Sequence, residues 1–309
     1  MVSILNSVVP IFAVIALGNV LRRFQVIDDT FIAVSDRLIY YIFFPALLFW
    51  KIGKPQAAGA AIETGLIFAV LCAVFIVFVM SLILVKLVRM PDYAVGSVAQ
   101  GCFRFSTYIG MAFMLAATGE EGLWQLGVLI GFVIPFINVL AVAILIWFSG
   151  ESYAWSRKAA LLVKATLLNP FIMACMLGIL YSKLNTPFPV FVDNALGLVS
   201  LPALPLALVS IGGSLTLTKL HGHLKYASAA AIFKLVILPV VGYFCLQLFN
   251  VSDMPFKIAM IFFALPTSPA SYILSAQLNS DVDLATAAIV LSTLLSICSL
   301  SATLWVYGG

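Results

Sequence analysis

The chain has 309 residues, of which 63% are hydrophobic and only 9% are charged, and its formal net charge is +4. Soluble domains carry about 25% charged residues, so this composition excludes a soluble globule, a disordered chain and a disulfide-rich secreted scaffold. The aromatic residues lie within apolar runs and not among basic residues, which also excludes nucleic-acid binding. The composition predicts a polytopic helical membrane protein.

Ten apolar segments, each long enough to cross a membrane, follow one another along the chain. They cover residues 3–21, 34–52, 62–85, 93–117, 122–147, 163–182, 188–214, 224–249, 255–278 and 284–307. The short connections between them leave no room for a soluble domain. The first segment lacks the basic n-region and the cleavage site of a signal peptide, so we interpret it as the first span.

The basic residues divide unequally between the two sets of loops. The loops after odd-numbered spans hold ten Lys and Arg residues, the other loops hold four, and two lie inside spans. Because Lys and Arg concentrate in cytoplasmic loops, this distribution places the odd-numbered loops in the cytoplasm. We therefore expect an integral protein of the plasma (bacterial inner) membrane, with both termini on the outer face.

The two halves of the chain share a spacing of motifs. Three pairs of corresponding positions are 160, 157 and 161 residues apart: Pro10 with Pro170, Pro45 with Pro202, and Arg104 with Leu265. These matches predict two five-helix repeats, residues 1–150 and 151–309. A repeat with an odd number of spans must have inverted topology, which is typical of secondary transporters. Prolines mark helix breaks in the second and seventh spans: Pro45, Pro202 and Pro205.

The ninth span contains two prolines within a run of hydroxyl residues. Pro266 and Pro269 remove two backbone donors and clash with preceding carbonyls. The hydroxyls of Thr267, Ser268 and Ser271 lie where the freed backbone groups need partners. Two interpretations stay open. One is a kinked helix patched by its own hydroxyls, and the other is an unwound segment that forms a binding site.

The fourth span carries the corresponding motif without a proline. Its centre contains Arg104, Phe105, Ser106, Thr107 and Gly110, and the small and hydroxyl residues would permit a break. If both spans break and cross, two helix N-termini point at one central volume. Each N-terminus carries roughly half a positive charge and several unpaired N–H groups, so the pattern predicts an anion site.

Two cations lie deep inside predicted spans. Arg104 and Lys234 are each about ten residues from a span end, which is about 15 Å at 1.5 Å per residue. A cation at that depth costs roughly 2.5–3.5 kcal/mol, and no Asp or Glu lies comparably deep. The pair therefore indicates an anionic ligand, with binding to helix-end carbonyls or snorkelling to an interface as the alternative. The lack of a deep carboxylate disfavours obligatory proton coupling, whereas sodium near Thr267 and Ser268 stays open.

Several motifs, in this order and spacing, resemble the auxin efflux carrier family over essentially the whole chain. They are Tyr41–Phe49, Phe103–Gly110, Asn169 and Pro170 with Gly178, Lys234 with Pro239, and Leu265–Thr293. The family includes bacterial malate or malonate permease-like proteins and is similar to the bile-acid/sodium symporters. The resemblance implies crossover helices 4 and 9, a scaffold of helices 1, 2, 6 and 7, and a transport unit of helices 3, 4, 5, 8, 9 and 10.

The same resemblance implies an elevator-type carrier of organic anions, which forms a homodimer through its scaffold. The sequence departs from the family pattern at two positions in the fourth span. Phe105 replaces an Asn, and Ala112 replaces a Pro. The aromatic ring either favours a more hydrophobic carboxylate or marks a divergent member of the family.

We therefore predict a secondary transporter, an exporter of small organic anions, that needs no cofactor and is not an enzyme. Its partners are the organic anion and membrane lipid, with no nucleic acid. The alternatives are a sodium-coupled organic-anion symporter and an anion channel. A receptor and a membrane enzyme are disfavoured, because the loops are short and the chain contains no HExxH motif, deep carboxylate pair or Ser/His/Asp group.

Overall fold

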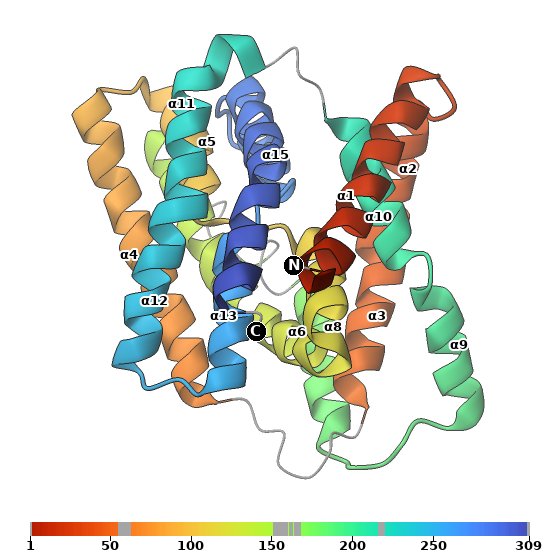
Figure 1. Cartoon of the computed structure of the whole chain (residues 1–309). Helices are drawn as coiled ribbons and strands as arrows, with labels where there is room; N and C mark the ends of the chain where they lie inside the picture. Colours follow the sequence, from red (N-terminus) through yellow and green to blue (C-terminus); the bar gives the residue numbers. More distant parts are fainter. Residues whose placement is uncertain are drawn as a thin grey trace. The chain divides into compact units, whose positions relative to one another are not determined.

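The computed structural model describes residues 2–54, 63–150, 160, 163, 168–215 and 220–307. Within these ranges all regular secondary structure is helical (Figure 1). Six helical stretches are long and apolar enough to cross a membrane: Asp29–Gly53, Thr64–Val88, Asp92–Phe148, Val190–Ser214, Gly222–Leu248 and Val282–Tyr307. The prediction of a polytopic all-α membrane protein is thereby confirmed. Ten spans in two inverted repeats stay a prediction, and both the repeat boundary at 150/151 and the start of the predicted sixth span touch residues outside the described ranges.

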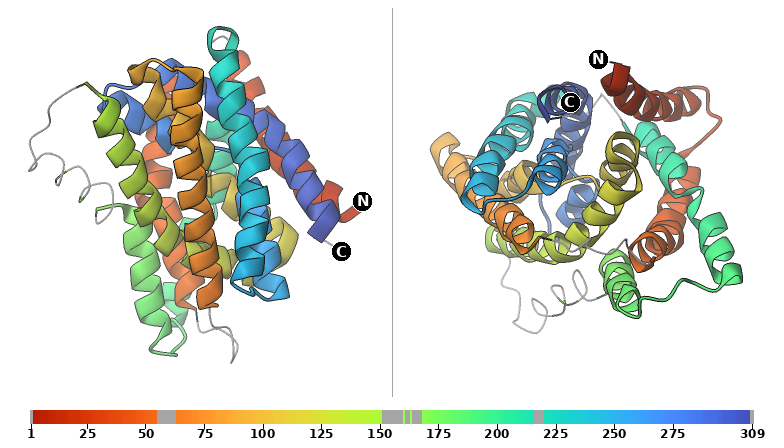
Figure 2. Two further views of the ribbon diagram at one scale, coloured as in Figure 1. Left: turned by 90° about the vertical axis from the view of Figure 1, so that its left-hand side faces the viewer. Right: turned by 60° about the horizontal axis from the view of Figure 1, so that its bottom comes forward.

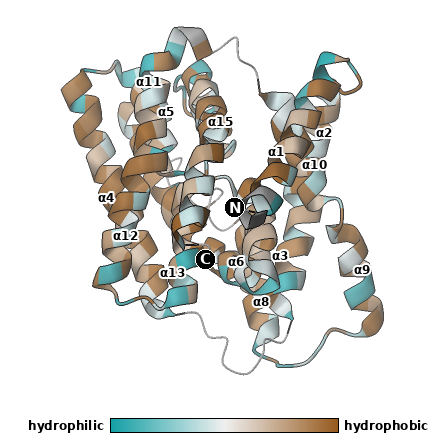
Figure 3. Cartoon of the chain, viewed as in Figure 1, coloured by the Kyte–Doolittle hydropathy of each residue, from teal (hydrophilic) through white to brown (hydrophobic). Residues whose placement is uncertain are grey.

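Hydrophobic residues are spread along most of the length of the helices (Figure 3). Helix α4, Thr64–Val88, exposes Phe68, Phe75 and Leu87 on its outer side, with exposed fractions of 56%, 48% and 77%. A helix that is apolar all round and still partly exposed is suited to a lipid surround.

The chain divides into two compact units, each built from separate stretches of sequence. Unit 1 comprises Met1–Ile62, Tyr108–Phe132 and Leu167–Leu215. Its helices are α1 (Val2–Arg23), α2 (Asp29–Leu38), η1 (Ile39–Phe43), α3 (Phe44–Gly53), α8 (Pro170–Ser182), α9 (Val190–Ser200), α10 (Ala203–Ser214) and part of α6 (Thr107–Phe148). Helix α1 packs against α10, and α3 packs against α8.

The contact between α1 and α10 depends on two glycines. A Cβ atom on Gly18 would collide with the backbone of Val209, and one on Gly212 would collide with the backbone of Ile15. The two helix backbones therefore approach each other closely, as small residues permit in membrane helices.

The prolines of unit 1 affect its helices in different ways. Pro45 does not interrupt helical structure, because the π-helical turn η1 precedes it and widens the helix where the ring would clash. Two turn residues, Leu201 and Pro202, separate α9 from α10, and both keep helical backbone angles. Pro205 lies in the first turn of α10, where its missing N–H has no helical partner anyway. Breaks at Pro45, Pro202 and Pro205 stay a prediction.

Unit 2 comprises Glu63–Thr107, Val133–Thr166 and Thr216–Gly309. Its helices are α4, α5 (Asp92–Phe103), the rest of α6 (Thr107–Phe148), α11 (Leu220–Ile232), η3 (Phe233–Ile237), α12 (Leu238–Leu248), α13 (Asp253–Ala264), α14 (Ala270–Gln277) and α15 (Val282–Tyr307). Helix α4 lies along α12 (Figure 2), and α11 packs against both α5 and α15. Residues 94–103 of α5 and 258–264 of α13 are all buried, so these two helices form the core of the unit.

Candidate functional site

Two helix breaks lie in the core of unit 2. Helix α5 ends at Phe103 and α6 begins at Thr107, so three residues between them are not helical. Helix α13 ends at Ala264 and α14 begins at Ala270. The residues that follow the two helices, Arg104 and Leu265, both have extended backbone angles. The structure thus contains breaks at both positions where the sequence predicted them.

Hydrogen bonds join the two breaks to each other. The backbone N–H of Ser106 donates to the carbonyl of Pro266 at 2.8 Å. The hydroxyl of Thr267 donates to the carbonyl of Gly101, also at 2.8 Å. Gly101 lies in the last turn of α5, where carbonyls have lost their helical partners. Each break therefore satisfies polar groups that the other leaves open, among buried residues.

Lys234 and Ser299 hold the end of α13. The fully buried Lys234 ammonium donates to the carbonyl of Phe263 at 2.9 Å, and the Ser299 hydroxyl donates to the carbonyl of Ala264 at 2.8 Å. A cation at a helix C-terminus is also stabilised by the helix dipole. This geometry supports the helix-end role that sequence analysis gave as the alternative for Lys234. Direct contact between Lys234 and substrate stays a prediction.

Arg104 is 6% exposed and lies within the first break. Its Nη2 donates to Oδ1 of Asn138 at 3.1 Å, and its Nη1 makes a longer bond of 3.5 Å to Oε1 of Gln100. Both acceptors are neutral amides, so these two bonds orient the guanidinium without cancelling its charge. The residues predicted for the site do not include Gln100 and Asn138, although each is an amide within a long apolar run.

An aromatic pair fills the space beside Arg104. The Phe105 ring is 4% exposed and meets the Phe262 ring edge-to-face, with 4.4 Å between the ring centroids. The prediction that Phe105 lines a substrate site is untested, but the structure does place an apolar surface directly in the break.

The start of α14 is largely satisfied by its own residues. The Ser268 hydroxyl accepts from the N–H of Ala270 at 3.2 Å, and the Ser268 carbonyl accepts from the N–H of Ser271. Pro269, the N-cap, has no N–H to offer. The Ser271 hydroxyl is fully buried and has no hydrogen-bond partner among the described residues. A ligand at this helix start would therefore find one ready donor, the Ser271 hydroxyl.

The remaining predicted residues lie at the start of α6. Thr107 is buried and is the first residue of that helix, whereas Gly110 is buried one turn later, in the part of α6 that belongs to unit 1. A sodium ion near Thr267 and Ser268 also stays a prediction. The hydroxyls of both residues are engaged in the hydrogen bonds described above. The described residues contain no group of three or more His, Cys, Asp or Glu that could hold a metal ion.

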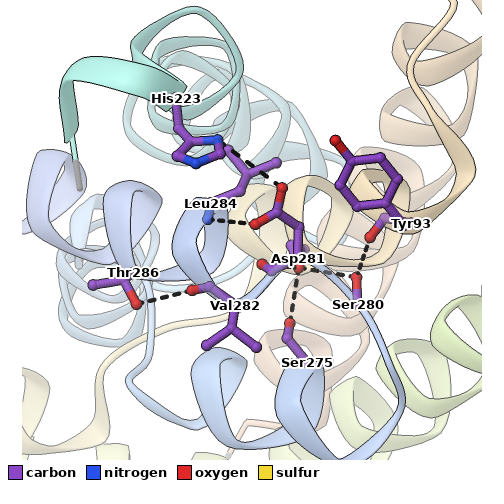
Figure 4. A network of polar contacts seen from close by, with 9 residues as sticks. Tyr93, His223, Ser275, Ser280, Asp281, Val282, Leu284 and Thr286 are labelled. Atoms are coloured by element: carbon purple, nitrogen blue, oxygen red, sulfur yellow. Dashed lines mark hydrogen bonds and ion pairs between the residues drawn. The ribbon is translucent and has the colours of Figure 1, made fainter.

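A chain of polar contacts runs from Arg104 along α5 and α14. The Gln100 amide donates to the Ser275 hydroxyl at 3.4 Å, and Ser275 lies 2.9 Å from the Ser97 hydroxyl. Beyond Ser97 the contacts continue to the turn before α15 (Figure 4). Ser97 and Gln100 lie three residues apart and share one face of α5, and Arg104 follows directly after the end of that helix. Ser97, Gln100 and Ser275 are not among the residues predicted for the site.

An all-α membrane protein with two broken helices joined around a buried arginine has the features of a membrane transporter. Comparison with known proteins agrees. The family described as membrane transport protein matches residues 3–306, and the chain belongs to that family. The family predicted from the sequence motifs is thereby confirmed.

Individual relatives are distant, and two of the three described here match along nearly the whole chain. An "Uncharacterized transporter" of Methanocaldococcus jannaschii is 20% identical over 308 residues, which is 98% of each chain. A "Putative malonate transporter" of Rhizobium meliloti is 22% identical over 308 residues, covering 99% of this chain and 96% of the relative. An "Uncharacterized transporter" of Methanothermobacter thermautotrophicus is 24% identical over 149 residues, 48% of this chain and 49% of the relative. These names indicate a transporter and not an enzyme.

Proposed function

We propose that this membrane transporter is a secondary carrier that exports small organic anions by alternating access. The observation that carries the proposal is the buried arginine, Arg104, at the junction of two broken helices. A buried guanidinium is costly within a membrane, and in such a place it marks a substrate pathway by default. The Ser271 hydroxyl supplies a hydrogen-bond donor at the start of α14.

An internal symmetry supports the architecture that such carriers have. Helices α5 and α13 begin at residues 92 and 253 and end at 103 and 264, so both ends are 161 residues apart. The kink at Gly119 in α6 maps by the same offset to residue 280, in the turn between α14 and α15. We infer ten spans in two inverted repeats, with α5–α6 and α13–α14 as the crossover helices.

The elevator mechanism assigns a fixed role to unit 1 and a moving role to unit 2. The predicted scaffold spans fall in unit 1 apart from residues 163–166, and the two breaks, residues 104–106 and 265–269, fall in unit 2. The predicted transport unit includes all of the fourth and fifth spans, residues 93–117 and 122–147. The two compact units instead divide α6, which covers most of these residues, between them. The exposed apolar side chains of α9, Val190, Phe191 and Leu198, are available for lipid or for a second copy of the chain, and we include a homodimer through unit 1 in the proposal.

The membrane potential would drive export without a coupling ion. We place the protein in a bacterial inner membrane with both termini outside. Moving one negative charge out of an inside-negative cell gains about 2.3 kcal/mol per 100 mV, which supports a gradient of roughly 50-fold. The name of the Rhizobium relative points to a dicarboxylate, whereas the Phe105–Phe262 pair favours an apolar body. Both classes therefore belong in the test.

The test is flux in liposomes that contain the purified protein. Labelled monocarboxylates and dicarboxylates are followed under a set membrane potential, each with and without sodium and pH gradients. We expect saturable flux that follows voltage alone and shows counterflow. Flux that requires sodium would replace the uniport proposal with symport, unitary currents without counterflow would show a channel, and no flux of any carboxylate would contradict the anion site.

A further inference from the structure

An apolar groove runs between α3 and α8, two neighbouring helices of unit 1 (Figure 1). Its volume is about 310 Å³, at the lower end of the range of roughly 300–1,000 Å³ that small-molecule sites have. Helix α3 contributes Pro45, Ala46 and Phe49, and α8 contributes four residues from Pro170 to Leu177. No lining side chain carries a charge or a hydrogen-bond donor, so the groove does not suit the organic anion of the proposed function.

Contacts at both ends of the groove fix the spacing of the two helices. Near the helix starts, the buried rings of Phe44 and Phe171 stack with 5.4 Å between their centroids. Towards the helix ends, a Cβ atom on Gly178 would lie 2.9 Å from the Cβ atom of Ile52, so the backbones approach closely there. Between these contacts the small side chain of Ala46 leaves space unfilled. The groove is therefore built into the packing of unit 1.

The groove lies at the depth of the acyl chains of one membrane leaflet. Phe49 and Pro45 precede Gly53, the end of a stretch long enough to cross a membrane, by about 6 and 12 Å along the helix. Half of the hydrocarbon core of a bilayer is about 15 Å thick. Met173 and Leu177 on the α8 side are 48% and 54% exposed, and such apolar exposure suits a hydrocarbon surround.

The shape of the groove favours a single hydrocarbon chain as its occupant. The groove extends from Pro170 to Leu177, which is about 10 Å along α8, so its mean cross-section is about 30 Å². An α-helix with its side chains is about 10 Å across and cannot enter a groove this narrow. An acyl chain can, and the unbranched side chain of Met173 adapts to the chain that it contacts.

Aromatic side chains mark the membrane–water interface at one end of the groove. The Phe49 ring, which lines the groove, meets the Phe188 ring with 5.5 Å between centroids, and Phe188 stacks on Tyr181 at 4.3 Å. The indole N–H of Trp50 donates to the carboxylate of Asp193 at 2.6 Å. Trp and Tyr concentrate at the level of the lipid headgroups, so a chain in the groove would have its headgroup at this end.

One lysine at this end is available for a headgroup. The ammonium groups of Lys51 and Lys54 are paired with carboxylates on α6 and α9, at 2.7 and 3.1 Å. Lys183 directly follows the last residue of α8, is exposed, and forms no ion pair with any residue in the described part of the chain. It lies six residues after Leu177, about 9 Å along the helix, which a lysine side chain and a glycerol backbone can span.

We propose that this groove binds one phospholipid, with an acyl chain between α3 and α8 and the phosphate at Lys183. The chain gains dispersion contacts with two helices, which a lipid on a flat helix surface does not have. A lysine at the headgroup level adds attraction to the phosphate. The site therefore retains a particular lipid molecule, in contrast to the lipids that cover the rest of the surface. The proposal does not rest on the proposed function.

The test is titration of the purified full-length protein in detergent with dioleoylphosphatidylglycerol, with bound lipid counted by native mass spectrometry. We expect one lipid per chain to bind saturably before further lipids add. Dioleoylglycerol has the same chains without the phosphate and should bind about 2- to 5-fold more weakly, the range of an exposed ion pair.

Two variants separate the chain from the headgroup. Ala46→Phe fills the groove and should weaken binding of the first lipid at least about 10-fold, whereas Ala13→Phe, at an exposed alanine of α1, should not. Lys183→Gln should abolish the preference for the phosphate over dioleoylglycerol. Its matched control is Lys86→Gln, at an exposed lysine in the last turn of α4.

Four results would overturn the proposal. They are no saturable first lipid in the wild type, wild-type affinity in Ala46→Phe, an unchanged phosphate preference in Lys183→Gln, and a chain dimer that Ala46→Phe dissociates without loss of lipid. Thermal unfolding checks that each variant is folded. If Ala46→Phe is not, a phosphatidylglycerol with a diazirine in its acyl chain decides on the wild type. Crosslinks to the groove residues that excess unlabelled lipid suppresses would support the site, and crosslinks only elsewhere would contradict it.

Discussion

The two breaks of unit 2 have different causes, although they are hydrogen-bonded to each other. The break after α13 is caused by the local sequence, because Pro266 and Pro269 have no backbone N–H to donate to a helical hydrogen bond. The break after α5 contains no proline, and the Ser106 N–H and the Gly101 carbonyl are hydrogen-bonded to the other break. A helix can therefore be opened from within by its sequence or from outside by a neighbour that supplies alternative hydrogen bonds.

The largest expected effect is on anion transport and comes from removing Arg104, the cation in the break without prolines. Arg104→Ala should weaken transport of an anion by about 10- to 100-fold, because a hydrogen bond to a charged group contributes about 1.5–3 kcal/mol. Flux in liposomes at several substrate concentrations measures it. Arg89→Ala, an exposed arginine outside the helices, is the control. Wild-type affinity in Arg104→Ala would discard the electrostatic site.

Lys234→Met tests whether the cation at the end of α13 is structural. The variant keeps most of the side-chain volume and leaves the Phe263 carbonyl without its 2.9 Å donor. We expect a loss of about 1–3 kcal/mol in the free energy of unfolding, with little change in substrate affinity. Thermal unfolding and a substrate titration separate the two roles. A large loss of affinity at unchanged stability would instead assign Lys234 to the substrate.

Thr267→Val tests the bond from the second break back to α5. The side chains have nearly the same shape, so the change removes the hydroxyl that donates to Gly101. A loss of about 1 kcal/mol in stability is expected, since a buried carbonyl is left unsatisfied. Thr286→Val is the matched control, because the Thr286 hydroxyl bonds a carbonyl within its own helix. Equal losses of stability in the two variants would show that the bond between the breaks stabilises the protein no more than a bond within one helix.

Pro266→Ala should have the smallest effect and addresses the comparison most directly. The variant restores a backbone donor in the second break, which favours a continuous helix and should reduce transport by a few-fold. The tertiary bonds of Lys234, Ser299 and Thr267 oppose that straightening, so the reduction stays modest. Flux in liposomes measures it. Wild-type flux would show that tertiary bonds alone hold this break, as they hold the other.

Much of the architecture could be predicted because membrane helices carry strong local signals. Hydropathy located the apolar helices, and the depth of Arg104 and Lys234 within apolar runs identified both as unusual. The partners of those cations could not be predicted. Asn138 lies 34 residues from Arg104, and the Phe263 carbonyl lies 29 residues from Lys234, so only the packing of α5, α6, η3 and α13 brings them together.

The sequence by itself determined the class of protein, the apolar helices and the break at Pro266, because each depends on composition or on a residue's own backbone chemistry. Only the tertiary structure decided what holds the break at Arg104, the role of Lys234 at a helix end and the polar contacts around Ser97. The physical reason is the same for all three. Buried polar groups must be paired, and their partners come from segments far apart in the chain.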